Sequence, residues 1–179
     1  MKTILQAARL LLVLTLLTGI VYPLAVTGIA KVAFPRAAGG SLVYNGETLV
    51  GSHLLAQKFE SDGYFWPRAS SADYATVVSG ASNKGPINSD LVKLVGERRE
   101  QFGPDAPDEL LTASASGLDP HLSPAAAAHQ IARVAAARDL PNERVTAFVN
   151  QATEAPQFGF LGEPRINVLR LNLLLDGHQ

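Results

Sequence analysis

One run of the sequence, from residue 10 to residue 30, is long and apolar enough to cross a membrane. No side chain in this run carries a charge. A helix of this length extends roughly 31 Å, which matches the roughly 30 Å of hydrocarbon in a bilayer. We therefore expect a transmembrane helix over residues 10–30, preceded by a short tail of residues 1–9. A single span encloses neither a pore nor a transport path, so any role in transport requires other chains.

A cleaved signal peptide is the alternative interpretation of this run. Lys2 and Arg9 form a basic start, and the small residues at 28–30 offer a peptidase site before Lys31. The run is longer than the roughly 7–15 apolar residues of a signal core, which favours a retained anchor. Mass spectrometry of the mature N-terminus separates the two interpretations, because cleavage would leave Lys31 as the first residue.

Pro23 lies in the middle of the expected span. Proline lacks a backbone N–H and predicts a kink in the helix. In lipid the carbonyl that proline leaves unpaired needs another donor, which Thr18, Thr27 or a neighbouring helix could supply.

The flanking charges leave the orientation of the helix nearly balanced. Lys2 and Arg9 lie before the run, and Lys31 and Arg36 lie after it. A long domain after a first helix can cross the membrane regardless of local charge, and a basic N-terminal tail favours the cytoplasm. We therefore expect residues 1–9 in the cytoplasm and the bulk of the chain outside it.

About 145 residues follow the run, enough for one domain with its own core. They carry 13 of the 15 basic residues and all 16 acidic residues, which gives a net charge of −3. No basic stripe indicates binding to nucleic acid. The absence of cysteine excludes disulfides, thiolate metal sites and cysteine nucleophiles.

The pattern after the run predicts an α+β fold: a single N-terminal transmembrane helix, a linker over residues 31–40, and one mixed α/β extracytoplasmic domain over residues 41–179. Asn45-Gly46 between two short apolar runs predicts a hairpin with a type I′ turn. Asn88 and Ser123 are expected to cap two helices. The expected helices cover residues 89–101, a segment from Pro124, residues 141–153 and, against a competing strand pattern, residues 166–175.

Four polar side chains within eight residues raise the possibility of a serine hydrolase. Ser114, Ser116, Asp119 and His121 have the residue types of a catalytic triad. Close neighbours in a turn rarely bring a base within reach of a nucleophile, so a tight loop is the preferred interpretation. A membrane-tethered hydrolase stays open as an alternative, as does an exported binding protein.

The histidines do not predict a metal site. His121 and His129 lie eight residues apart with no third ligand at helical spacing. His53 and His178 are isolated in the sequence. We expect surface or capping roles for these side chains, with neither a metal nor a catalytic residue in the chain.

Two segments combine aromatic, small and polar residues in a way that is typical of binding surfaces. Residues 64–68 hold the only tryptophan, Trp66, and an arginine, Arg68, that could stack on it. Residues 79–83 form a small polar loop that could offer amides to an anion or a partner. A core role for the aromatic residues and a structural role for the loop are the alternatives.

Several blocks, in this order after a single apolar helix, resemble the C subunit of the bacterial potassium-transporting Kdp ATPase (KdpC). The most specific block runs from Thr112 to Pro124, and the resemblance covers essentially the whole chain. The other blocks are Gly51-Ser52 with residues 57–59, Tyr64-Phe65 with Arg68, residues 79–83 with 85–88, Gln130 with Arg133, and residues 162–169 with Leu171-Asn172.

The resemblance implies a non-catalytic accessory subunit of an ATP-driven potassium uptake complex in the inner membrane. Its partners would be a pump subunit that hydrolyses ATP and a channel-like subunit that passes potassium, and it would assemble the complex and raise the pump's affinity for ATP. The chain has no D-K-T-G phosphorylation sequence and no T-V-G-Y-G filter, in keeping with that division of roles.

The resemblance to the KdpC family implies that Gln130 is related to the effect on ATP affinity. A domain outside the cytoplasm cannot contact cytoplasmic ATP. We therefore expect ATP to bind elsewhere in the complex, and this chain to change the pump subunit's affinity for ATP indirectly, through contacts between subunits. The expected partner contacts come from the aromatic segment, the small loop and the Thr112–His121 loop. The candidate residues are Tyr64, Phe65, Trp66, Arg68, Ser79, Asn83, Ser116, Asp119 and His121.

Overall fold

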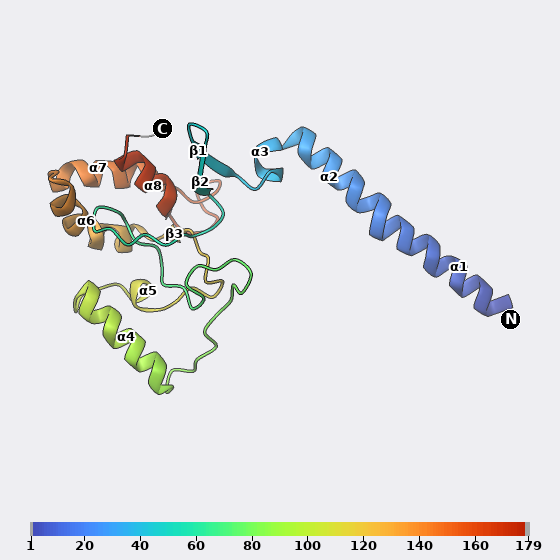
Figure 1. The fold of residues 1–179 in the computed structure, drawn as a ribbon, viewed down its shortest axis with the longest axis horizontal. Coiled ribbons are helices and arrows are strands. Elements are labelled where there is room, and N and C mark those ends of the chain that lie inside the picture. The colour runs from blue at the N-terminus through green and yellow to red at the C-terminus, as the bar shows by residue number, and fades with distance from the viewer. Residues whose placement is uncertain (1, 178–179) are drawn as a thin grey trace. The chain divides into compact units, whose positions relative to one another are not determined.

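The computed structural model describes residues 2–177, and the chain divides into two compact units (Figure 1). The first unit ends at Leu42, and the second, called the domain below, begins at Val43. The helical elements of the first unit are α1 (Lys2–Leu16), the π-helical turn η1 (Leu17–Val21), α2 (Tyr22–Ala33) and α3 (Pro35–Ala38).

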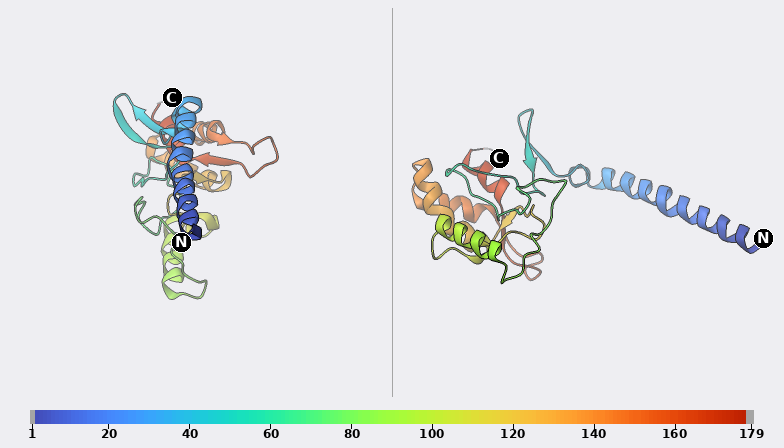
Figure 2. Two further views of the ribbon diagram at one scale, coloured as in Figure 1. Left: turned by 90° about the vertical axis from the view of Figure 1, so that its right-hand side faces the viewer. Right: turned by 60° about the horizontal axis from the view of Figure 1, so that its bottom comes forward.

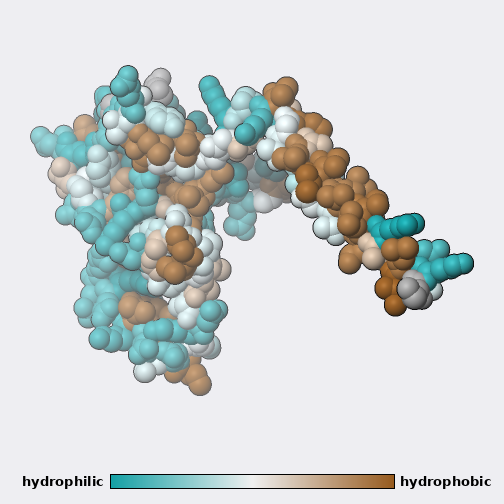
Figure 3. Space-filling model, turned by 45° about the vertical axis from the view of Figure 1, so that its right-hand side comes forward, coloured by the Kyte–Doolittle hydropathy of each residue, from teal (hydrophilic) through white to brown (hydrophobic). Residues whose placement is uncertain are grey.

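The expected apolar helix is confirmed and is longer than predicted. Helical structure continues from Lys2 to Ala33, 32 residues that by length and composition can cross a membrane. None of its residues is buried within the chain. Figure 3 shows apolar side chains along the helix and hydrophilic ones near its N-terminal end.

The irregularity expected at Pro23 lies in the turn that precedes it. The N–H of Tyr22 donates to the carbonyl of Leu17, five residues back, so η1 is one residue wider than an α-helical turn. The hydroxyl of Thr18 donates to the carbonyl of Leu14 at 2.7 Å. Thr18 therefore does not serve the carbonyl of Gly19, which the ring of Pro23 leaves without its usual donor.

The expected hairpin is confirmed, but the expected turn type is wrong. Strands β1 (Leu42–Asn45) and β2 (Thr48–Ser52) pair with each other and are joined by Gly46 and Glu47. Gly46 has a φ of +61°, whereas Asn45 belongs to the strand and has no positive φ. A type I′ turn needs a positive φ at both connecting positions, and Glu47 has none. The connection is therefore shifted by one residue and fits a type II′ turn, which has glycine at its first position.

The core of the domain consists of a three-stranded antiparallel sheet packed with helices, which confirms the α+β class. Its strand order is β3-β5-β4, with His121 opposite Asn167 and Thr153 opposite Ile166. The remaining elements are β3 (His121–Leu122), β4 (Thr153–Glu154), β5 (Arg165–Asn167), α4 (Ser89–Phe102), α5 (Asp108–Leu111), α6 (Pro124–Arg138), α7 (Asn142–Ala152) and α8 (Val168–Leu175).

The buried side chains come mainly from α6, α7, α8 and the central strand β5. Val134 and Val145 meet where α6 packs on α7, and Ile166 places its side chain in the same cluster. Small alanines on α6 allow this close approach. The fully buried apolar residues of the cluster are Phe65, Leu110, Leu122, Ala126, Ala127, Val134, Val145, Ala152, Ile166, Val168 and Leu171.

Both predicted caps are confirmed. The hydroxyl of Ser123 accepts from the N–H of Ala126 at 3.1 Å, and Glu109 accepts from the N–H and hydroxyl of Ser123 at 2.9 and 2.8 Å. The carbonyl oxygen of the Asn88 side chain accepts from Asp90 and Leu91 at 3.0 and 3.3 Å. The ambiguous segment 166–175 contains both patterns, because β5 ends at Asn167 and the Asn167 side chain then caps α8.

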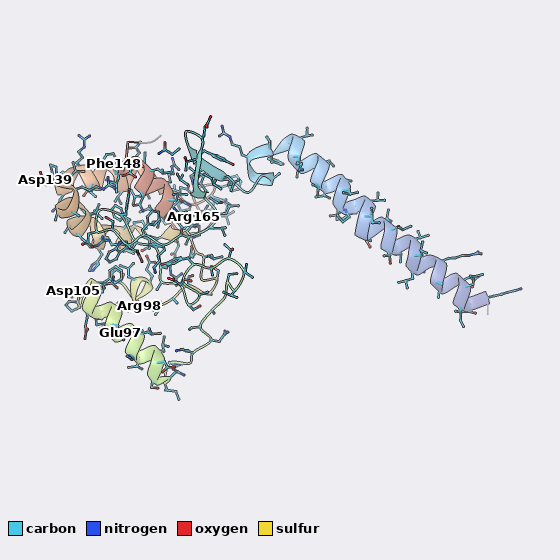
Figure 4. All side chains as sticks on the ribbon, viewed as in Figure 1. Glu97, Arg98, Asp105, Asp139, Phe148 and Arg165 are labelled. Carbon is cyan, nitrogen blue, oxygen red and sulfur yellow. The ribbon has the colours of Figure 1, made fainter. Side chains whose placement is uncertain are left out.

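Helix α4 is packed more loosely than the other long helices of the domain. None of its residues is buried, although α6, α7 and α8 each bury several. Arg98, labelled in Figure 4, links it to α5 by donating from Nη1 to the carbonyl of Leu111 at 2.8 Å. The apolar residues of α4 are therefore only partly covered, and Val92 is exposed.

We expect the two caps to differ in their effect on stability. Ser123→Ala should lower the free energy of unfolding by about 1 kcal/mol, because α6 carries much of the core. Asn88→Ala should change it less and should instead speed amide exchange in the first turn of α4, because that helix can fray while the core stays folded. Urea unfolding of the full chain in detergent, with hydrogen exchange, measures both. Equal losses of global stability would contradict this difference.

Candidate functional site

The aromatic segment predicted as a binding block is held inside the domain by two buried amide side chains. The first is Asn172 of α8, whose Oδ1 accepts from the N–H of Phe65 at 2.8 Å and whose Nδ2 donates to the carbonyl of Phe65 at 3.0 Å. Both residues are almost fully buried. The amide thus completes the hydrogen bonds of a backbone that belongs to neither a helix nor a strand.

The second amide is Gln130 of α6, which makes the same pair of bonds one residue further on. Its Oε1 accepts from the N–H of Trp66 at 2.9 Å, and its Nε2 donates to the carbonyl of Trp66 at 3.0 Å. Arg133 donates to the same Oε1 at 2.7 Å. Gln130 is 1% exposed, so both polar atoms of its side chain are engaged inside the domain.

Two arginines of α6 cover the outer aromatic rings of the segment. The guanidinium of Arg133 lies 3.7 Å from the centroid of Trp66, and that of Arg138 lies 4.8 Å from Tyr64. Both distances are typical of cation–π contacts. The arginine stacked on Trp66 is therefore Arg133, and the expectation that Arg68 could take this place is wrong.

Asp176, just after α8, links Tyr64 to Arg138. It accepts from the hydroxyl of Tyr64 at 2.9 Å and from Arg138 at 2.8 Å. The hydrogen bond to Asp176 raises the pKa of Tyr64 above its usual value, because it favours the protonated phenol. Tyr64 therefore stays a hydrogen-bond donor at neutral pH.

Arg68 pairs instead with the loop before β3. Its Nη1 lies 3.2 Å from Oδ2 of Asp119, whose Oδ1 accepts from the backbone N–H of His121 at 3.1 Å. The neighbouring His121, through its ring and its backbone N–H, and then Arg68 hold the pKa of Asp119 below its usual value. The structure thus brings together three of the predicted site residues, all partly exposed.

The small loop 79–83 and the Thr112–His121 loop meet the residues that directly follow the aromatic segment. Ser114 donates its N–H to the carbonyl of Ala69 at 2.9 Å, and the hydroxyl of Ser71 donates to the carbonyl of Gly80 at 2.6 Å. Gly117 has a φ of +69°, and a Cβ there would lie 3.1 Å from the carbonyl of Gly80. Only glycine fits this contact without strain. Residues 68–71, 79–83 and 112–121, called the loop cluster below, therefore form one surface.

The predicted contact residues differ in what they expose. Phe65 is 0% exposed, so its side chain offers no surface to a partner and belongs to the core. Ser79, Asn83 and Ser116 are exposed on the loop cluster, and Asn83 adopts a left-handed conformation with a φ of +52°. The partly exposed candidates are Tyr64, Trp66, Arg68, Asp119 and His121.

The geometry around the serines is that of a structural loop. The hydroxyl of Ser116 accepts from the N–H of Leu118 at 3.1 Å, and Ser114 is 2% exposed, with an unpaired hydroxyl. The ring of His121 lies 3.7 Å from Asp119, and no hydrogen bond between residues 2 and 177 joins it to a serine. A base within reach of a nucleophile is what a triad requires.

The other histidines lie apart. The carbonyl of His53 accepts from the side chain of Asn167 at 2.8 Å, and the ring of His129 contacts the carbonyl of Phe102 at 2.7 Å. No group of three potential ligands able to hold a metal ion occurs in the described part of the chain. His178 lies outside the described residues.

Sequence reasoning gave no role to Asn172 and Arg133, and it related Gln130 to ATP rather than to the aromatic segment. Asn172 carried a signal, because it is a lone amide within the apolar run from Val168 to Leu175. A polar side chain at such a position is buried and needs partners. Arg133 follows Gln130 by three residues on α6, and this spacing places both on the same face. Nothing in the sequence indicates that their partner is the backbone 64 residues away.

The family model of the K⁺-transporting ATPase c chain, KdpC, matches residues 4–177. This chain belongs to the KdpC family. Proteins named potassium-transporting ATPase KdpC subunit are similar over nearly their whole length. The one from Dechloromonas aromatica is 50% identical and covers 98% of both chains, and the one from Pseudomonas putida strain F1 is 53% identical over 95% of this chain and 93% of its own.

Membership of the KdpC family confirms the resemblance seen in the sequence blocks. As a KdpC chain the protein is a component of a potassium uptake complex and belongs with other Kdp subunits. Its helix of 32 residues, apolar enough to cross a membrane, fits a single-pass membrane subunit.

We expect the buried amide of Gln130 to be important for stability. Gln130→Met keeps the length of the side chain but leaves the N–H and carbonyl of Trp66 unpaired, so the free energy of unfolding should fall by about 2–4 kcal/mol. Gln151→Met, an exposed position on α7, should change it by less than about 0.5 kcal/mol. Urea unfolding of the full chain in detergent measures both variants, and similar values for the two would contradict this role.

Asp119 should make the stability depend on pH in the acid range. Its lowered pKa means that ionised Asp119 stabilises the folded state; this contribution is complete above the ordinary pKa of 3.8 and is lost as the pH falls through the lower pKa of the folded state. The difference in unfolding free energy between wild type and Asp119→Asn should therefore be largest near pH 6 and shrink toward pH 2. Asp105→Asn, at an exposed position, is the control. A difference independent of pH would contradict the expectation.

Proposed function

We propose that this KdpC chain is a non-catalytic accessory subunit that assembles the potassium uptake complex and raises the ATP affinity of its pump subunit indirectly. The observation that supports the indirect route is the engagement of Gln130. Its amide is buried and bonded to Trp66 and Arg133. Direct contact with a nucleotide would require this part of the core to open, at the cost of several buried hydrogen bonds.

We propose that the chain spans the inner membrane once, with residues 1–9 in the cytoplasm and the domain outside. The apolar helix supports the single span, and the basic N-terminal tail supports this orientation. In this arrangement ATP binds on the opposite side of the membrane from the domain. The effect on ATP is then a coupling between two conformational states of the complex, with a typical size of about 1–3 kcal/mol.

The loop cluster is the proposed contact with the channel-like subunit. Ser79, Asn83 and Ser116 expose their side chains on it. Its backbone is fixed by the Ala69–Ser114 bond, by the Arg68–Asp119 pair and by the close approach of Gly117 to Gly80. Binding to a surface that is already ordered loses less conformational entropy than binding to a flexible one. Tyr64 and Trp66 support this surface through their packing on α6.

Adding positive charge to the loop cluster tests assembly. Ser79→Lys with Ser116→Lys places two bulky cations on the loop cluster at exposed positions, and should lower the amount of pump and channel-like subunits that co-purify with the tagged chain. Ala128→Lys with Gln151→Lys adds the same charge at exposed positions on α6 and α7 and is the control. Equal recovery of the complex with both variants would exclude the loop cluster as the contact.

The same variants test the effect on ATP. In the complex that still forms with Ser79→Lys and Ser116→Lys, the KM for ATP should rise by about 5-fold or more, since a coupling free energy of this kind corresponds to about 5–150-fold. Photoaffinity labelling with azido-ATP should modify the pump subunit and leave the KdpC chain unlabelled. Labelling of the chain that Gln130→Ala abolishes would contradict the indirect mechanism.

A further inference from the structure

The connection between β4 and β5 presents the most exposed aromatic side chains of the domain. Phe158 and Phe160 are 86% and 76% exposed, and Leu161 is 50% exposed. No charged residue occurs from Ala155 to Gly162. The left view of Figure 2 shows this loop projecting from the body of the domain. A solvent-facing loop with this composition is uncommon unless it meets an apolar environment.

The loop has a defined shape. Gln157 and Leu161 each donate an N–H to the carbonyl of the other at 2.9 Å, which closes the loop tip (residues 157–161) as a small hairpin. Phe158 and Gly159 have φ values of +55° and +82°. A phenylalanine in the left-handed region is strained, and such strain persists where the position serves a purpose other than stability.

The backbone of the loop tip distinguishes between a lipid and a protein partner. Gly159 donates to the carbonyl of Pro156 at 3.0 Å and Phe160 to that of Gln157 at 3.3 Å, so four of the five N–H groups of the tip are bonded inside the loop. Hydrocarbon offers no partners and requires internal bonding of this kind. A protein interface instead carries roughly one hydrogen bond per 100–200 Å², which an uncharged tip with engaged amides supplies poorly.

The proposed anchor keeps the domain close to a bilayer. The apolar helix ends at Ala33 and the domain begins at Val43. Ten residues span at most about 35 Å when fully extended, and the α3 turn shortens this. A contact made within one tethered molecule needs little intrinsic affinity, because the effective concentration of the partner is high.

We propose that the loop tip inserts Phe158 and Phe160 into the interfacial layer of the same bilayer that holds the apolar helix. The contact would give the domain a second point of attachment to the membrane and would restrict its rotation about the linker. The ligand is a lipid surface, recognised by apolar side chains without headgroup specificity. This inference rests on the proposed membrane anchor.

The absence of cysteine allows a direct test with single spin labels on the full chain in phosphatidylcholine–phosphatidylglycerol nanodiscs. Gln157→Cys places the label beside both phenylalanines, and the collision rates with oxygen and with a nickel chelate report lipid or water around it. Lys93→Cys on exposed α4 is the water control, and Leu14→Cys within the apolar helix is the lipid control. We expect the ratio of oxygen to nickel collisions at 157 to exceed that at 93 several-fold.

A second variant shows whether the phenylalanines cause this contrast. Adding Phe158→Ser and Phe160→Ser to Gln157→Cys should reduce the ratio to the value at 93, while the emission of Trp66 stays unchanged because both side chains lie outside the core. A water-like label at 157 together with a lipid-like label at 14 would overturn the inference and leave the anchor standing. A water-like label at 14 would contradict the anchor itself. A label at 157 that is shielded only when the other Kdp subunits are present would indicate a protein contact and would also overturn the inference.

Discussion

The pairing of two buried amides with an extended backbone is the interaction on which the rest of the domain depends. The segment Phe65–Trp66 runs through the core without belonging to a strand, so its peptide groups require partners from elsewhere. Asn172 of α8 and Gln130 of α6 supply two bonds each. Leaving such groups unpaired would cost about 1–3 kcal/mol each. The two amides therefore connect two helices through the segment and fix the starting point of the loops that follow it.

The residues in and next to this segment contact the core, α6 and the loop before β3 in turn. Phe65 enters the core, Trp66 and Tyr64 are covered by arginines of α6, and Arg68 reaches the loop before β3. The loop cluster is thus rigid because of contacts behind it. A KdpC domain with this design has no need of a large sheet, since side-chain amides do locally what a strand ladder does in other folds. Among the helices of the domain that the structure describes, only α4 buries no residue.

Much of the fold followed from local rules. The apolar helix and the two capped helix starts were predicted because each depends on residues adjacent in sequence. The hairpin was predicted correctly, but the predicted turn type was wrong. Asn45-Gly46 and Gly46-Glu47 are both acceptable connecting pairs, and the pairing of the strands decides between them. The strands β3 and β4 have two residues each, too few for any periodicity to appear.

In the candidate site, too, the sequence predicted local features but not the contacts between distant segments. Residue types and their grouping indicated three special loops, yet nothing in the sequence placed them side by side, because Gly117 meets Gly80 across 37 residues. The stacking partner predicted for Trp66 was wrong for the same reason. Arg68 is close to Trp66 in sequence, whereas Arg133 is close to it in space.

The sequence by itself determined the apolar helix, the class of the domain, the starts of the two capped helices and the family, since these depend on composition, on spacing and on motifs. Only the tertiary structure decided which side chains are free to meet other molecules. Burial removed Phe65 from the surface and engaged Gln130 inside the core, while it left Phe158 and Phe160 exposed. Burial is a property of the packed chain as a whole, because each side chain is covered by residues that lie far from it in sequence.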